Sequence, residues 1–105
     1  MGASKADEFS DDLNQIAILA KAIAHPARVA IVNYLLIKKT CISRDFEKEI
    51  PLSQPTISQH ISVLTSAGLM HGKTIGNTIC YHINNSALKD LSKYCKKAVK
   101  KNHRF

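Results

Sequence analysis

The sequence has no export signal, no long apolar run and no closely paired cysteines, and each absence excludes a class of protein. The apolar stretch Ile16–Ile23 is short and contains Lys21, so we expect no membrane span. The three cysteines have no paired spacing, which, without an export signal, predicts a protein of the reducing cytoplasm.

Glycine, proline and catalytic motifs are also scarce. With four glycines and three prolines in 105 residues, most of the chain is expected to be regular structure, in one domain with a modest core. The sequence contains no nucleophile–base pair, no glycine-rich phosphate loop and no complete metal motif. An enzyme is therefore the least favoured functional class.

Acidic residues nearly disappear after Pro51. Up to Ile50, seven basic residues balance seven acidic ones, whereas from Pro51 onward eight basic residues stand against Asp90 alone. The whole net charge of +7 therefore lies in the second half of the chain. Solubility alone would not require this asymmetry, and one-sided basic charge favours an acidic polymer as the partner.

Charge of either sign is absent between Ile50 and Gly72, a segment that includes the helix around which the chain is organised. Ser53 is a capping residue type, and Pro55 suits the first turn of a helix, where a missing N–H costs little. Gly68 suits the left-handed position at which a helix ends. Spacings of four and three predict one buried stripe, formed by Ile57, Ile61 and Leu64.

The opposite face of this helix carries amides and hydroxyls. Such groups donate and accept hydrogen bonds at base edges in the major groove, and they do not repel phosphate. A merely solvated face is the alternative, but the basic half of the chain favours DNA. We expect DNA contacts from Ser53, Gln54, Thr56, Ser58, Gln59, His60 and Ser62, with direct base readout by Gln54 and Gln59. For His60, a hydrogen bond within the fold or to a backbone phosphate is favoured.

The remaining patterns predict a mainly α fold with a small β-hairpin. A helix capped by Ser10 runs to Ala24, and further helices are expected at 26–39, 44–50 and 87–100, with a brief strand at 40–42. The second helix should bury Val29, Ile31, Val32, Leu35 and Leu36 and expose Arg28, either for a phosphate contact or only for solvation. A short helix, the turn Pro51-Leu52 and the uncharged helix form a helix-turn-helix layout.

Two strands, Leu69–Ile75 and Thr78–Ile83, are expected on either side of Gly76-Asn77. Glycine at the first central position suits a type II′ turn, so the segment is predicted to be a hairpin. The buried face of the second strand should consist of Ile79, Tyr81 and Ile83. A hairpin directly after a recognition helix is a wing, and Lys73 and Thr74 near its tip are expected to contact phosphate or the minor groove.

The first helix is apolar on nearly all sides, which is more than the surface helix of a monomer needs. A partner chain is therefore expected on its second face, and the stripe of the last helix packs on the core or on that chain. Dimer contacts are assigned to Leu13, Ile16, Ala20, Leu88, Leu91 and Cys95. The domain is assigned to 10–100, after a flexible lead-in (1–9) and before a basic tail (101–105).

Four segments, Leu19–Ile31, Leu52–Ile61, Ala67–Leu69 and Cys80–Ile83, resemble the ArsR/SmtB family of small winged helix-turn-helix repressors. The run Ser-Gln-x-x-x-Ser-x-His that starts at Ser53 carries most of the likeness. The resemblance implies a homodimer built from the first and last helices. It also implies binding to a pseudo-palindromic operator in double-stranded DNA and release by an inducer.

The resemblance leaves the inducer open. Arsenic-sensing members carry a Cys-x-Cys pair where this chain has Cys41-Ile42-Ser43, and arsenite needs roughly three soft thiolates. The positions of the carboxylate–histidine zinc site are occupied here by Asn85, Ala87, Ala98 and Lys101, so that site is absent. Thiol-sensing members pair a second-helix cysteine with one in the last helix, and this chain has Asn33 and Cys95 there.

Cys41 and Cys80 are the thiols that remain for sensing. If the brief strand lies beside the wing, the two become neighbours, and a soft metal or an oxidant can join them. The alternative is that all three cysteines are small buried hydrophobic residues. A DNA-binding repressor is thus the favoured function. The alternatives are a winged-helix protein-interaction module without DNA binding and an ArsR-like regulator that senses no metal.

Overall fold

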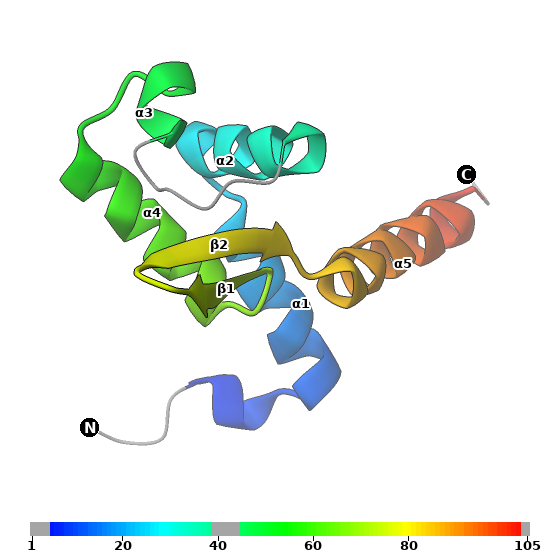
Figure 1. Cartoon of the computed structure of the whole chain (residues 1–105). Helices are drawn as coiled ribbons and strands as arrows, with labels where there is room; N and C mark the ends of the chain where they lie inside the picture. Colours follow the sequence, from blue (N-terminus) through cyan, green and yellow to red (C-terminus); the bar gives the residue numbers. More distant parts are fainter. Residues whose placement is uncertain (1–4, 39–44, 104–105) are drawn as a thin grey trace.

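The computed structural model of the chain describes residues 5–38 and 45–103 (Figure 1). In chain order its elements are the 3-10 helix η1 (Lys5–Glu8), α1 (Asp11–Ala22), α2 (Pro26–Ile37), α3 (Asp45–Glu49), α4 (Gln54–Ser66), β1 (Met70–Ile75), β2 (Thr78–Ile83) and α5 (Asn85–Asn102). The order of the α-helices and the hairpin agrees with the sequence prediction, whereas η1 lies in the segment that was predicted as a flexible lead-in. The brief strand predicted at 40–42 lies outside the described residues, as does Arg44.

Capping side chains mark the starts of α1 and α2, two helices that are bent by 90° relative to each other. Ser10 Oγ accepts a hydrogen bond from the backbone N–H of Leu13 (3.3 Å), as expected of a helix N-cap. His25 Nδ1 accepts from the backbone N–H of Ala27 (3.0 Å), and Pro26 opens α2. The predicted break at His25-Pro26 is therefore confirmed, and its cap is an imidazole.

One cluster of buried side chains joins all five α-helices to the hairpin. The uncharged helix contributes the predicted stripe, since Ile57, Ile61 and Leu64 are buried. The other elements meet it with Leu19, Ile31, Phe46, Met70 and Ala87. Because α4 is anchored by this stripe, its polar face is left at the surface.

The prediction for α2 was wrong at two positions. Ile31, Val32 and Leu35 are buried, but Val29 is 41% exposed and Leu36 is 60% exposed. At 100° per residue, Val29 and Leu36 lie about 100° or more from the centre of the face that the three buried residues define. Both are apolar, but the helix presents only one face to the core.

The hairpin pairs Met70 with Ile83 and Ile75 with Thr78, in antiparallel register. Gly76 has φ +61° and is followed by no residue with positive φ in the turn, which agrees with the predicted type II′ turn. Tyr81 faces Phe46, with the ring centroids 6.3 Å apart, whereas Ile79 is 46% exposed. Burial of Ile79 was thus wrongly predicted, because the strand extends past the core toward its turn.

Asn84 joins the end of α4 to the start of α5. Its Nδ2 donates to Gly68 O (2.8 Å), and its Oδ1 accepts from the N–H of Ser86 (3.2 Å). The cap of α5 is therefore Asn84, and the helix begins at Asn85, two residues before the start predicted at position 87. In the part of the chain described, no single helix is long and apolar enough to cross a membrane. Helices α1 and α2 meet both criteria only when they are taken together, and they form a sharply bent pair.

Candidate nucleic-acid interface

The segment from α3 to α4 has the geometry of a helix-turn-helix. Helix α3 ends at Glu49, and the N–H of Leu52 donates to Ile50 O (2.7 Å) in the turn. Helix α4 follows at once, with the N–H of Ile57 bonded to Ser53 O (3.0 Å). The hairpin packs against α4, so the recognition helix and the wing belong to one side of the domain (Figure 1).

The polar residues of α4 differ in how far they reach solvent. Ser58, Gln59 and Ser62 are exposed, whereas Gln54, Thr56 and His60 are half-buried. The exposed members lie on the face opposite the buried stripe, where a groove of DNA has access. Of the seven residues assigned to DNA contact, these three therefore have the most open position, together with Ser53.

Two hydrogen bonds organise the start of α4. Ser53 Oγ and Thr56 Oγ1 are 3.0 Å apart, and Gln54 Nε2 donates to Ser58 Oγ (3.3 Å). The expected cap from the Ser53 hydroxyl to a backbone amide was wrong, because that hydroxyl bonds with Thr56 instead. The amide nitrogen of Gln54 is likewise engaged on its own helix, whereas the side chain of Gln59 is exposed.

His60 makes the expected hydrogen bond within the fold. Its Nδ1 lies 3.2 Å from Arg28 Nη1, and its ring centroid lies 4.4 Å from that of His25. Partial burial lowers the pKa of His60 below its usual value of 6.5, and the neighbouring His25 and Arg28 lower it further. His60 is thus half-buried at the inner edge of the polar face of α4, and its surroundings favour the neutral imidazole.

Arg28 is not the exposed residue that the sequence predicted. It is half-buried, and its Nε donates to Ala22 O (2.6 Å) while its Nη2 donates to Lys21 O (3.3 Å). A guanidinium held in this way is not presented to DNA as a phosphate contact. Nothing in the sequence around Arg28 indicates these partners, which come from the bend between α1 and α2 and from the packing of α4 on α2.

The wing exposes both residues assigned to it. Lys73 and Thr74 are exposed on β1, opposite Cys80 and Ile79 on β2. Lys73 places a cation beside a helix that carries none, which suits a contact to phosphate next to a groove.

The three cysteines have different surroundings. Cys41 lies outside the described residues. Cys80 is half-buried on β2 and is disulfide-bonded, whereas Cys95 on α5 is free and exposed. Among the residues that the structure describes, no three His, Cys, Asp or Glu side chains are grouped as metal ligands.

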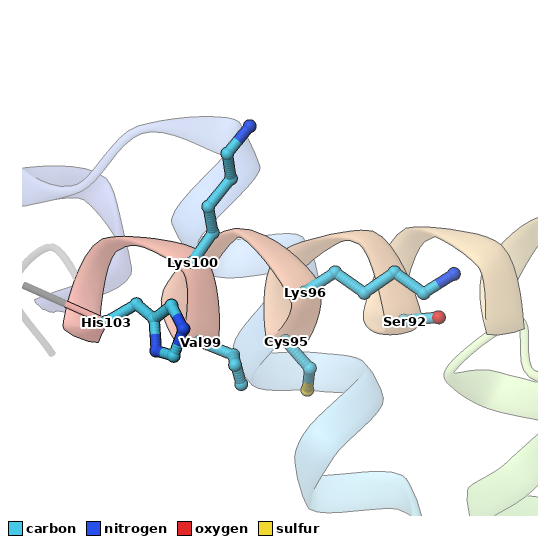
Figure 2. Close-up of a pocket in the computed structure, with 6 residues that line it drawn as sticks. All are labelled: Ser92, Cys95, Lys96, Val99, Lys100 and His103. Atoms are coloured by element: carbon cyan, nitrogen blue, oxygen red, sulfur yellow. The ribbon is translucent and has the colours of Figure 1, made fainter.

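Helices α1 and α5 pack together and also expose apolar side chains. Of the residues assigned to a dimer, Leu13, Ala20 and Cys95 are exposed, whereas Ile16, Leu88 and Leu91 are half-buried. Leu88 and Leu91 pack partly against the core of their own chain. Ile18 (48% exposed), Tyr94 (50%) and Val99 (69%) are further exposed apolar side chains on these two helices that the assignment does not include, and Val99 lies one turn beyond Cys95. Figure 2 shows Cys95 and Val99 on the same edge of α5, in a shallow groove that ends at His103.

Comparison of the sequence with known families gives a match over the helix-turn-helix. Residues 25–71 match the family described as bacterial regulatory protein, arsR family. The chain is 32% identical over 73 residues to the HTH-type transcriptional repressor SmtB of Mycobacterium tuberculosis, a match that covers 70% of this chain and 53% of that protein. The chain thus spans about half the length of this curated relative.

Solved structures share the fold. An ArsR-like transcriptional regulator from Rhodococcus sp. RHA1 superposes with a TM-score of 0.79, covering 90% of this chain and 89% of that chain at 18% identity. A homodimeric winged helix-turn-helix DNA-binding domain from Mycobacterium bovis, a possible ArsR-family regulator, gives 0.69, with 99% and 94% covered at 20% identity. The fold is therefore a winged helix-turn-helix.

Proposed function

We propose that the chain, whose residues 25–71 match the arsR family of bacterial regulatory proteins, is a transcriptional repressor of this family that binds double-stranded DNA. The family is one of regulators and not of enzymes, which agrees with the absence of a catalytic motif from the sequence. Binding to an operator takes place in the cytoplasm, where the DNA is.

One observation carries this proposal. The exposed face of α4 carries several uncharged polar groups and no charged residue, and it stands in a helix-turn-helix with a basic wing beside it. Uncharged amides and hydroxyls suit base edges, and the net charge of +7 suits the phosphates. A protein-interaction module would not need this combination.

Selection of duplexes from a random pool, followed by binding titrations, tests the proposal directly. We expect one pseudo-palindromic sequence to be enriched and to bind far more tightly than unrelated duplexes. Affinity should fall steeply with salt, because each phosphate contact adds about 0.9 to the slope of log affinity against log salt. Enrichment of no sequence, together with binding that salt does not weaken, would contradict the proposal and favour a protein partner.

The repressor is proposed to act as a homodimer through α1 and α5. Both helices expose apolar side chains, from Leu13 and Ile18 on α1 to Tyr94 and Val99 on α5. The M. bovis relative, which has the same fold, is homodimeric. The interface includes Leu13, Ile16, Ala20, Leu88, Leu91 and Cys95. Two subunits place two copies of α4 on the two halves of a pseudo-palindrome.

The inducer is proposed to act on the thiols of Cys41 and Cys80. The disulfide-bonded state of Cys80 supports thiol chemistry on the second strand of the wing. A peroxide would take two electrons and two protons from the two thiols, forming one S–S bond and leaving the peroxide oxygens as water or alcohol. The disulfide formed at the wing then changes the position of α4 on DNA.

Serine variants test this inducer. The double variant Cys41→Ser, Cys80→Ser should bind the operator and stay bound when peroxide is added, whereas Cys95→Ser should be released like the wild type. Release of the double variant by peroxide would contradict the assignment. Release of the wild type by arsenite but not by peroxide would replace the oxidant with a soft metal at the same thiols.

A further inference from the structure

The side chain of Arg28 joins three elements through hydrogen bonds. Arg28 lies in the first turn of α2. Two of its nitrogens donate to Lys21 O and Ala22 O, the carbonyls at the end of α1, over 3.3 and 2.6 Å. The third, Nη1, lies 3.2 Å from Nδ1 of His60 on α4. One planar group thus connects the end of α1 with the middle of the recognition helix.

The chemistry of these partners determines the protonation state of His60. Arginine offers five N–H donors and no acceptor. The bond therefore needs a lone pair on Nδ1 of His60, so that ring carries its proton on Nε2 only. His25, whose ring is 4.4 Å away, uses its own Nδ1 in the same way to accept from Ala27.

We propose that Arg28 is a positioning residue for DNA binding, which fixes the recognition helix to the end of α1 through a His60 ring that is unprotonated at Nδ1. The inference rests on the proposed function, since it concerns how the DNA-binding helix is held. Helix α1 belongs to the proposed dimer surface, so the contact relates the direction of α4 to the subunit interface. The two half-sites of an operator lie about 34–36 Å apart, so a small tilt of each α4 moves the two recognition helices out of register with them.

Arginine suits this role better than lysine does. Its planar fork presents donors in several directions at once, whereas an ammonium offers all its donors from one nitrogen. A lysine at position 28 cannot reach the carbonyls of Lys21 and Ala22 and also His60. The positive charge is also favourable at the carboxyl end of α1, where carbonyls lack helical partners.

Protonation of His60 opens this contact, because it removes the acceptor and places a cation beside the guanidinium. Helix α4 has no charged residue; burial lowers the pKa of His60 most, and the neighbouring His25 and Arg28 lower it further. The other titratable side chains described on the elements packed against α4 are Tyr34, Glu47, Lys48, Glu49, His71 and Lys73. Because the folded state favours the neutral ring, the contact stabilises the fold above about pH 6.5 and is lost as pH falls through the lowered pKa.

Two substitutions of His60 separate positioning from direct DNA contact. Asparagine places its amide oxygen near the position of Nδ1, whereas glutamine places its amide group near the position of Nε2. We expect His60→Asn to bind the operator within about twofold of the wild type, and His60→Gln to bind roughly tenfold more weakly, the factor for one hydrogen bond to a charged group. The reverse order would overturn the inference, since it would mean that Nε2 contacts DNA.

The pH profile of DNA affinity distinguishes this contact from a merely structural role of His60, which would leave the profile unchanged. A change of pH affects the rest of both proteins alike, so the wild-type affinity is divided by that of His60→Asn at each pH. Between about pH 7.5 and about pH 5.5 this ratio should fall, because only the wild type loses its contact. A ratio that is flat or rises on acidification would overturn the inference.

A variant of Arg28 and a matched control test the contact without DNA. Arg28→Met should raise the pKa of His60, measured by NMR, toward its usual value and weaken operator binding. Lys38→Met removes an exposed positive charge from the other end of α2 and should do neither. If the wild type binds no duplex at all, the proposed function fails. If it binds but the pKa of His60 is the same in both variants, this inference alone fails.

Discussion

Replacement of Gln59 by alanine should remove base discrimination from the recognition helix. Gln59 is exposed on α4, and its amide can pair with the N6 and N7 atoms of adenine. Gln54, which the sequence does not distinguish from it, is half-buried, with its Nε2 bonded to Ser58 Oγ (3.3 Å). We therefore expect Gln59 to carry the larger share of base readout.

The expected magnitude follows from the number of contacts. One bidentate pair between an amide and a base discriminates by about 1–3 kcal/mol. A symmetric dimer brings one Gln59 to each half-site, and the two lie far enough apart to add, which gives about 2–6 kcal/mol on a palindromic operator. Gln54→Ala should lie at the lower end of this range, because contact with a base first requires the bond with Ser58 to open.

Fluorescence anisotropy with the selected operator and its single-base variants measures this effect. Gln59→Ala should bind the operator more weakly and lose the preference at one base pair in each half-site. Asn33→Ala, which truncates an exposed amide on α2, serves as the control and should change nothing. If Gln59→Ala bound more weakly but ranked all the base variants as the wild type does, the assigned reading face would be wrong.

Three further changes test other parts of the proposal. Lys73→Ala should weaken binding to all duplexes alike and reduce the salt slope by about one per subunit, and an effect on one base pair only would contradict the phosphate assignment. Val99→Glu should dissociate the dimer in sedimentation, since it would bury an unpaired charge. The control Val29→Glu, on the exposed side of α2, should leave the dimer intact. A dimer that survives Val99→Glu excludes this part of α5 from the interface. Ile57→Ala should lower the free energy of unfolding by about 2–5 kcal/mol, because Ile57 is fully buried under α4, and a loss well below this in chemical denaturation would contradict the assigned core stripe.

Local patterns were sufficient to predict the elements and most of their ends. Ser10 and Gly68 act as the sequence predicts, because a cap depends on residues within a few positions along the chain. Periodicity also predicted the buried stripe of α4. It failed for Val29 and Leu36, since apolar character does not say which side of a largely apolar helix meets the core.

Capping partners were predicted less well than capping residue types. Ser53 stands before α4 as expected, but its hydroxyl bonds with Thr56, and α5 is capped by Asn84, which the sequence analysis did not single out. Several hydroxyl and amide groups lie within reach at each helix start. The choice among them depends on backbone angles that neighbouring residue types do not determine.

The contact between Arg28 and His60 marks the limit of reasoning from sequence. The two residues lie 32 positions apart, and each has an ordinary surface role when considered alone. Only the bend of 90° between α1 and α2 brings the carbonyls of Lys21 and Ala22 to the guanidinium, and only the packing of α4 on α2 brings His60 to its other side. An isolated guanidinium at the surface would be free to contact phosphate. Held by two carbonyls and one imidazole, it acts on DNA only through the direction in which it holds α4.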